Sequence, residues 1–296
     1  MSPGSPFLRA VIVGGNGAVG QMLFAALSGS GVQSVTLIDR RFTDRAAVGA
    51  DCIVADILRA DVATLDVIGA SDITILALPE EPAVDALDLL LPRLSATALL
   101  VDTLSVKSRY AQRLAEIGTE CELLGINPMF APDLGFAGRS AIVVAYAARM
   151  RAQQFQDLLA AWGTTVVRLS VEQHDRACAA LQVATHAAVL GFALALRASG
   201  YDTRSLEPIM PPPHRTLLAL TGRILAADPA VYHDIQAANP YASEMRSRLR
   251  EAQQKLEASI AAGPEEFANT VDELREMLTQ GDVDYAALCA RLFAVR

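Results

Sequence analysis

The sequence predicts an α/β protein in which a doubly wound parallel sheet is followed by an all-helical region. Short runs of β-branched residues alternate with helical patterns up to about residue 169, and strand patterns almost vanish after residue 170. The length of 296 residues also suits about two domains. We therefore expect one domain over residues 1–169 and a helical domain over residues 170–296.

A βαβ unit is predicted at the start of the chain. Residues 8–13 form an apolar run that ends at Gly14-Gly15, and a helical pattern covers residues 18–28. A second apolar run, residues 34–38, is followed by Asp39. Strand, glycine turn, helix and strand within about thirty residues are typical of a dinucleotide-binding unit.

Strands and helices continue to alternate after this unit. Further strands are expected to end near residue 56 and to cover residues 72–78, 98–102, 121–126, 140–145 and 165–169, with helices over residues 82–91, 106–117 and 151–162. Beyond them, Ala/Leu-rich helices are expected over residues 172–199, 215–227, 241–262, 264–280 and 285–293. Such helices can pack as a bundle and supply a dimer interface.

Charge and cysteine content limit the class of function. The net charge is −8, and the sequence lacks the clustered Lys and Arg that a phosphate backbone requires, so no nucleic-acid partner is expected. The four cysteines are far apart and lack metal-binding spacing. We expect no metal site and four reduced, buried thiols in a cytoplasmic protein. Residues 1–6 lack signal-peptide features, and no run of eighteen apolar residues predicts a membrane span.

The glycine turn carries the clearest motif. Gly15-Asn16-Gly17-Ala18-Val19-Gly20 matches GxGxxG. In such a Rossmann domain the first glycine permits the tight turn, the second lets the backbone approach a pyrophosphate, and the third allows close helix–strand packing. The helix that begins near Ala18 directs its amide groups at the phosphates.

The preference between NAD and NADP depends on the end of the second strand. Asp39 is placed to accept hydrogen bonds from ribose hydroxyls, which favours NAD because a carboxylate repels a 2′-phosphate. Arg40 and Arg41 follow directly and can pair with that phosphate, so NADP stays the alternative. Leu78 and Pro79, at the end of a later strand, are candidates for lining the nucleotide pocket, although strand termination explains Pro79 equally well.

Several segments together resemble the prephenate dehydrogenase family. They are Asp102-Thr103-Leu104-Ser105-Val106-Lys107, Gly125-Ile126-Asn127-Pro128-Met129-Phe130, Thr185-His186, and Arg215 followed by Gly222-Arg223, Asp228-Pro229 and Tyr232. The resemblance implies a helical dimerisation domain, a homodimer, and NAD(P)-dependent oxidative decarboxylation of a prephenate-like cyclohexadiene. In that reaction hydride leaves ring carbon 4 for the nicotinamide, carbon dioxide leaves carbon 1, and the ring becomes aromatic.

The resemblance assigns roles that have structural alternatives. Ser105 contacts the substrate or the carboxamide, or caps a helix before Val106. His186 binds substrate or is a core histidine. Arg223 binds a carboxylate of a small dicarboxylate substrate, or pairs with an internal Asp or Glu. Arg215 binds a substrate carboxylate or is solvated. Lys107 is expected as an exposed first-turn residue or a substrate contact. The other histidines, His174, His214 and His233, are expected at the surface or in packing.

Asn127 is the main departure from the family pattern. The family places there a catalytic histidine that accepts a hydrogen bond from the substrate's 4-hydroxyl, and Asn cannot take a proton. The favoured interpretation is a 4-amino substrate, 4-amino-4-deoxyprephenate, converted to 4-aminophenylpyruvate, because an amine lone pair itself stabilises the developing cation. The Asn127 oxygen then orients the amine, and some group must accept a proton from the ammonium form.

Other functions stay open at this point. The chain can be a prephenate or arogenate dehydrogenase with a relocated or missing base, or a relative that has lost activity. A different oxidoreductase, such as a hydroxyacid dehydrogenase or an imine reductase, shares the glycine turn but does not need Ser105, Asn127 and Arg223. A non-catalytic nucleotide-binding protein is the remaining alternative.

Overall fold

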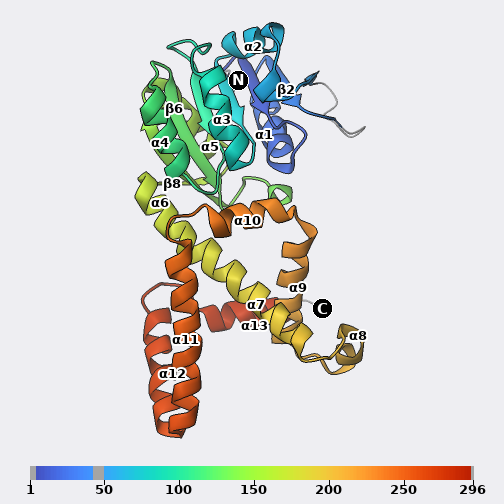
Figure 1. Cartoon of the computed structure of the whole chain (residues 1–296), viewed down its shortest axis with the longest axis vertical. Coiled ribbons are helices and arrows are strands. Elements are labelled where there is room, and N and C mark those ends of the chain that lie inside the picture. Colours follow the sequence, from blue (N-terminus) through green and yellow to red (C-terminus); the bar gives the residue numbers. More distant parts are fainter. Residues whose placement is uncertain (1–4, 43–49, 295–296) are drawn as a thin grey trace. The chain divides into compact units, whose positions relative to one another are not determined.

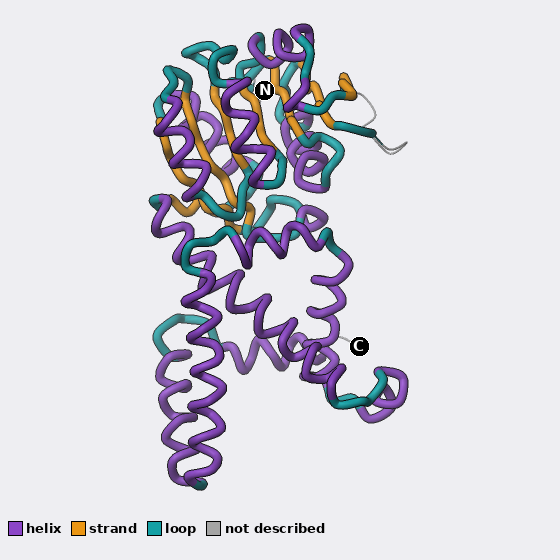
Figure 2. Tube along the Cα trace, in the orientation of Figure 1, coloured by secondary structure: helices purple, strands orange, loops and turns teal. Residues whose placement is uncertain are grey.

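The computed structural model describes residues 5–42 and 50–294, which fold into two compact units. Among these residues, the first unit contains those up to Cys178 together with His233–Pro240, and the second contains Ala179–Tyr232 and those from Tyr241 onward. The first holds the strands, and the described residues of the second form helices joined by loops, with no strand (Figures 1 and 2). The predicted domain boundary after residue 169 stays a prediction.

All eight expected strands are present in one sheet of the order β3-β2-β1-β4-β5-β6-β7-β8. Their bounds are β1 Arg9–Val13, β2 Ser34–Asp39, β3 Asp51–Val54, β4 Ile73–Leu76, β5 Leu99–Asp102, β6 Glu122–Pro128, β7 Ser140–Ala147 and β8 Thr165–Arg168. Strands β1, β4 and β5 are buried almost throughout, as a sheet covered on both faces requires.

The sheet is not parallel throughout, which corrects the sequence expectation. Strands β1 to β6 run parallel, but β7 is antiparallel to β6, and β8 is parallel to β7. A parallel connection needs a crossover, usually an α-helix, of a dozen or more residues. Residues 129–139 hold only the 3-10 turn η2 (Pro132–Leu134), so the chain can only turn back beside β6.

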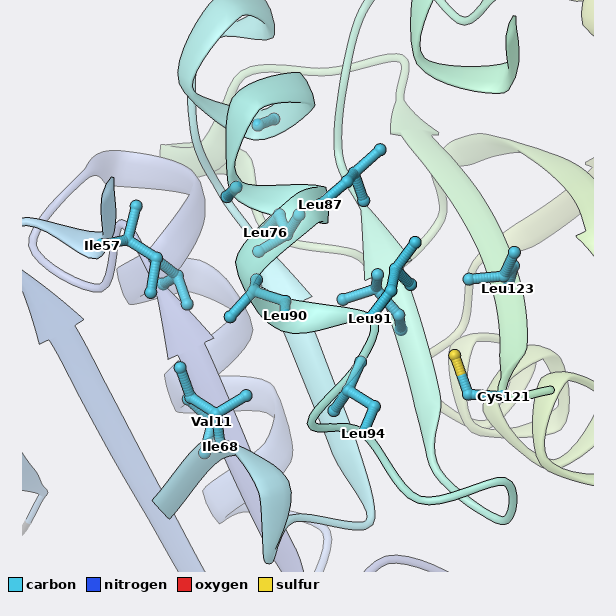
Figure 3. Packing of buried hydrophobic residues seen from close by; sticks show 14 of the residues in the cluster. Val11, Ile57, Ile68, Leu76, Leu87, Leu90, Leu91, Leu94, Cys121 and Leu123 are labelled. Carbon is cyan, nitrogen blue, oxygen red and sulfur yellow. The ribbon is translucent and has the colours of Figure 1, made fainter. Parts of the chain in front are cut away.

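Helices cover both faces of this sheet. One apolar layer packs β-strand side chains against α2 (Val62–Gly69), α3 (Glu80–Leu90) and α4 (Ser108–Ile117), and the other against α1 (Ala18–Ser28) and α5 (Met150–Ala161). In Figure 3, Leu76 of β4 and Leu87 of α3 lie in the first layer. The turn η1 (Ile57–Arg59) and α2 were not predicted. The fold is therefore doubly wound, as the sequence predicted.

The chain after residue 170 forms helices, as expected, with two additions. The long helix consists of α6 (Val171–Cys178), a π-helical turn η3 (Ala179–Val183) and α7 (Ala184–Ala198); then follow α8 (Thr203–Leu206), η4 (Glu207–Ile209), α9 (Pro212–Ala226), α10 (Pro229–Ala237), α11 (Ala242–Ala262), α12 (Pro264–Leu278) and α13 (Tyr285–Ala294). Helices α8 and α10 were not predicted. Helix α10 begins at Pro229, because proline is tolerated at the first helical position.

Further expectations concern the cysteines, membrane spans and the N-terminal segment. Cys121 and Cys178 are buried, but Cys52 and Cys289 are exposed, so the prediction of four buried thiols is wrong for half of them. Cys52 lies on the edge strand β3, and Cys289 lies on α13, which has no buried residue. One helix, Val171–Ala198, is long and apolar enough to cross a membrane by length and composition alone, and this is weak evidence. Residues 1–4 of the segment judged unlike a signal peptide lie outside the described residues.

Candidate functional site

The carboxyl edge of the parallel strands brings together most of the predicted site residues. Ligands bind at this edge in doubly wound sheets. The glycine turn follows β1, Asp39 ends β2, Leu78-Pro79 follow β4, Ser105 follows β5, and Asn127 is the penultimate residue of β6. Because β1, β2, β4, β5 and β6 are parallel, all these residues lie at the same edge.

The glycine turn is shaped by close backbone contacts. Gly14 takes the left-handed conformation with φ +84°, so the tight turn falls one residue earlier than predicted. A Cβ at Gly15 would lie 2.7 Å from Leu37 Cβ, and one at Gly20 would lie 2.3 Å from the Gly14 oxygen. Gly17, by contrast, is exposed and would meet only the Gly14 oxygen, at 3.3 Å. Its open face suits the close approach of a pyrophosphate.

The helix after the turn offers free amide groups to an anion. Helix α1 begins at Ala18, as predicted, and has neither a side-chain cap nor an acidic residue in its first turn. Ala18 is exposed and Val19 is half-buried, so the helix start is accessible. Unpaired amides and the positive end of the helix dipole favour a phosphate here.

Asp39 is held against the glycine turn. Its Oδ2 accepts a hydrogen bond from the Asn16 backbone N–H at 3.0 Å, which fixes the carboxylate beside the turn. Arg40 and Arg41 are exposed. Leu78 is half-buried and lies next to Gly14, since its Cδ2 would be 3.2 Å from a Cβ there, whereas Pro79 is exposed and precedes α3.

A buried ion pair supports the segment that carries Ser105. Lys107 Nζ contacts Asp102 Oδ1 and donates to the Ile126 carbonyl at 2.9 Å, and both charged side chains are fully buried. Tyr146 Oη donates to Asp102 Oδ2 at 3.0 Å. The expectation of an exposed Lys107 is therefore wrong. Ser105 is half-buried and lies before α4, which begins at Ser108, so it is not the cap of that helix.

Behind Asn127 lies a chain of buried polar groups. Asn127 Nδ2 is 3.0 Å from His174 Nε2 and 3.4 Å from Cys178 Sγ. His174 Nδ1 is 2.7 Å from Asp175 Oδ1, and both of these side chains are fully buried. His174 belongs to the packing residues anticipated from the sequence, not to the surface.

Asp175 also fixes the start of α4. Its Oδ1 accepts from the Lys107 backbone N–H at 2.9 Å, and its Oδ2 accepts from the Ser108 N–H at 3.0 Å and from the Ser108 hydroxyl. Burial raises the pKa of Asp175, but the hydrogen bonds from His174, Ser108 and Lys107 outweigh it and leave the pKa lowered. Burial, partly offset by Asp175, lowers the pKa of His174 and keeps the ring neutral.

Glu80 is a second buried acid at this edge. It is the first residue of α3 and is 7% exposed, and its Oε1 lacks a hydrogen-bond partner among the described residues. Burial raises the pKa of Glu80, Arg109 opposes this rise, and Asp234 and Asp175 add to it. This burial was not predicted, because Glu80 lies in an acidic segment at the start of a helix, where exposure is expected.

The remaining predicted residues belong to the second unit. His186 of α7 contacts the Tyr232 ring edge-on, with centroids 4.7 Å apart, and its Nδ1 is buried without a partner among the described residues. Burial and the nearby charge of Arg223 lower the pKa of His186. Arg223 and Arg215, both on α9, are exposed and form no ion pair with any described residue.

Comparison with known proteins assigns the family. A family model described as prephenate dehydrogenase, dimerization domain, matches residues 170–280. A protein from Streptomyces pristinaespiralis named 4-amino-4-deoxyprephenate dehydrogenase is 42% identical over 296 residues, which cover 99% of each chain. The chain belongs to the prephenate dehydrogenase family. The resemblance inferred from the sequence motifs is thereby confirmed.

Solved structures of the prephenate dehydrogenase family share the fold. Prephenate dehydrogenase from A. aeolicus, in complex with hydroxyphenyl propionate and NAD+, has a TM-score of 0.73 at 19% identity and covers 95% of this chain and 99% of its own. Arogenate dehydrogenase from Synechocystis has a TM-score of 0.64 at 18% identity, with the same coverage. These likenesses show the fold, including the helical second half.

Sequence reasoning missed the buried contacts that His174 and Asp175 make behind Asn127. His174 and Asp175 are adjacent on α6 and reach residues far away in sequence, so periodicity alone could not place them. The only available indication was a His-Asp pair at the start of a long apolar helix. No cluster of three or more His, Cys, Asp or Glu that could hold a metal occurs in the described part of the chain.

Proposed function

We propose that this protein catalyses the NAD(P)-dependent oxidative decarboxylation of 4-amino-4-deoxyprephenate to 4-aminophenylpyruvate. The observation that carries the proposal is Asn127, a hydrogen-bond acceptor that cannot take a proton, at the position of the family's catalytic histidine. A hydroxyl at carbon 4 needs a base as hydride leaves, whereas the lone pair of a neutral amine stabilises the cation unaided. The relative with 42% identity carries the name of this substrate.

The glycine turn and Asp39 fit a dinucleotide. Gly17 presents an open backbone face, the start of α1 presents free amides, and Asp39 is fixed beside the turn to accept from ribose hydroxyls. When bound, the nicotinamide ring supplies the hydride acceptor. Asp39 favours NAD, and Arg40 keeps NADP as the alternative. Leu78 and Pro79 are assigned to the wall of this site.

Substrate contacts are proposed for the residues that the family resemblance indicates. Asn127 orients the 4-amino group, and Ser105 contacts the substrate or the carboxamide of the nicotinamide. Arg223 and Arg215 are free of internal ion pairs among the described residues and are assigned to the substrate carboxylates, with His186 as a further contact. Loss of carbon dioxide aromatises the ring and drives the reaction, so the protein must mainly align the hydride and hold the carboxylates.

The active form is proposed to be a homodimer in the cytoplasm. The match of residues 170–280 to a dimerization domain supports the dimer. The long apolar helix Val171–Ala198 supports it too, because only 17% of its most apolar eighteen-residue stretch is buried within one chain. Four free thiols, two of them exposed, suit a reducing compartment.

The proposal is tested by following NADH formation with prephenate, arogenate and 4-amino-4-deoxyprephenate side by side, and by repeating the assay with NADP. We expect a kcat/KM for the amino substrate at least about 100-fold above the others, the size of effect that one mismatched polar contact produces. Asn127→His is expected to gain prephenate turnover and to lose part of this preference. Efficient prephenate turnover by the unaltered protein contradicts the amino-substrate assignment and favours a relocated base.

Two outcomes would identify the other candidates. Oxidation of simple hydroxyacids or imines, with no turnover of cyclohexadienes, would place the protein among the other oxidoreductases. Nucleotide binding without hydride transfer to any of the three acids would support a non-catalytic relative.

A further inference from the structure

The buried groups behind Asn127 form a directional hydrogen-bond chain. It runs from the backbone amides of Lys107 and Ser108 through Asp175 and His174 to the Asn127 side chain. Each link has a length of 2.7–3.0 Å, and all three side chains are at least 98% buried. The direction of each bond can therefore be deduced from which atoms are able to donate.

The first step fixes the histidine tautomer. Asp175 accepts hydrogen bonds from two backbone amides and one hydroxyl. Burial raises its pKa, but these hydrogen bonds and the one from His174 lower the pKa by more, so Asp175 is an ionised acceptor. His174 Nδ1 must therefore carry a proton and donate it to Asp175 Oδ1. Because the ring is neutral, Nε2 is left with a lone pair and can only accept.

The second step fixes the direction of the Asn127 amide. Nε2 of His174 accepts, so the atom 3.0 Å away must be the NH₂ group of Asn127. The second N–H of that group is directed at Cys178 Sγ, 3.4 Å away. Burial raises the pKa of Cys178 to about 11, so it remains a neutral thiol. Oδ1 of Asn127 then points away from both partners and accepts no hydrogen bond from the described residues.

We infer that His174, held by Asp175, is a positioning residue that keeps the Asn127 carbonyl oxygen turned toward the substrate's carbon-4 substituent. The inference rests on the proposed function, since it takes Asn127 as the group that meets this substituent. An oxygen held in this direction binds an N–H donor and holds the neutral amine, with its lone pair free for the ring. If the amide were reversed, its NH₂ would donate to that lone pair and withdraw it from the developing cation.

A double-mutant cycle tests whether His174 acts through Asn127. His174→Phe removes the acceptor of the Asn127 amide. We expect it to lower kcat/KM for the amino substrate about 10–100-fold, mainly in kcat, because the neutral hydrogen bond that orients Asn127 is lost. In the Asn127→Ala background the same change is expected to cost less than about twofold. An equal loss in both backgrounds overturns the inference, because a merely structural role does not depend on Asn127.

Matched variants separate positioning from packing. His174→Gln, whose side-chain oxygen can accept from Asn127, is expected to retain several-fold more activity than His174→Phe. Cys178→Ala, one turn further along α6, removes only a weak acceptor and is expected to stay within about threefold of the parent. Affinity for NAD should be unchanged within about twofold in all three, since the glycine turn lies after another strand. Greater loss in Cys178→Ala than in His174→Phe contradicts the inference.

The tautomer is measurable without any substrate. The chain has only four histidines, so ¹⁵N-histidine labelling gives four ring systems, and the His174→Gln spectrum identifies the one in question. We expect His174 to carry its proton on Nδ1 at pH 7.5, and a proton on Nε2 overturns the inference. Failure of the unaltered protein to oxidise the amino substrate would refute the proposed function, while this measurement would still decide the arrangement of His174.

Discussion

The buried residues of the candidate site differ in whether their side chains can gain or lose a charge. Asn127 cannot, His174 is kept neutral by burial, and Lys107 is tied to Asp102 in the interior. Asn127 and the neutral ring of His174 behind it therefore carry no charge near neutral pH, which suits the proposed substrate, because its amine supplies its own electron pair. Glu80 differs, because it is buried and its carboxyl Oε1 has no partner among the described residues.

Glu80 leads to a prediction about stability and pH. Burial raises its pKa, against the opposing charge of Arg109 and with the support of Asp234 and Asp175. A raised carboxyl pKa means that the stabilising contribution is fully present below the unfolded pKa, about 4.3, and is lost as the pH rises through the folded pKa. Glu80→Gln should therefore raise the melting temperature at pH 8 by roughly 2–4 °C, corresponding to about 1 kcal/mol.

Differential scanning fluorimetry from pH 4.5 to 8.5 measures this effect. The advantage of Glu80→Gln is expected to shrink toward the acidic end, where the parent carboxyl is itself neutral. Glu81→Gln, at the exposed neighbouring position of α3, is the control and should change little at any pH. An advantage that is independent of pH would show that Glu80 is not strained by its charge.

Among the elements, the glycine turn and α1 form the most tightly constrained junction. Three of its glycines face backbone or buried side chains, and only Gly17 faces outward. The turn therefore contains glycines that the packing requires and one, Gly17, that is open to a ligand. Substitution by alanine can separate these two roles.

Gly20→Ala and Gly17→Ala are predicted to fail in different ways. A Cβ at Gly20 lies 2.3 Å from the Gly14 oxygen and 2.9 Å from Gly15 Cα, so α1 must move away from β1, at a cost of about 1–3 kcal/mol. Gly17→Ala should leave the melting temperature within about 2 °C of the parent but weaken NAD binding at least about tenfold, as its methyl group faces the pyrophosphate. Thermal melts and NAD titrations of both variants decide this, and loss of stability in Gly17→Ala alone would reverse the assignment.

Elements with local causes were predictable, and contacts between distant elements were not. Helix α1 begins and ends where the sequence indicated, because a glycine turn precedes it and Gly29 follows it. The start of α4 was placed two residues early at Val106, since its first amides are held by Asp175, far away in sequence. The antiparallel direction of β7 relative to β6 was also not predicted, because hydrophobic periodicity does not indicate the direction of a strand. His174 illustrates the limit for the site, as burial of a lone histidine depends on three-dimensional packing.

For the molecule as a whole, the distribution of exposed apolar side chains is informative. Helices α7, α11, α12 and α13 each leave large apolar residues uncovered, among them Leu194, Ile260, Met277 and Leu292, which are 55–65% exposed. Uncovered apolar surface on this scale is typical of an interface. The family model that matches residues 170–280 is named for dimerization, so a second copy of the chain is the expected cover.

Light scattering after gel filtration is predicted to give twice the chain mass of 31.4 kDa at micromolar concentration. The double variant Leu194→Glu with Ile260→Glu removes two apolar contacts, each worth about 1.5–3 kcal/mol when buried, and should weaken association at least about 100-fold. Val62→Glu, at an equally exposed position on α2 in the first unit, should remain dimeric. A monomeric parent, or equal dissociation of the Val62 variant, would show that these helices do not form the interface, and their apolar faces would then need another cover, such as a different partner or a lipid surface.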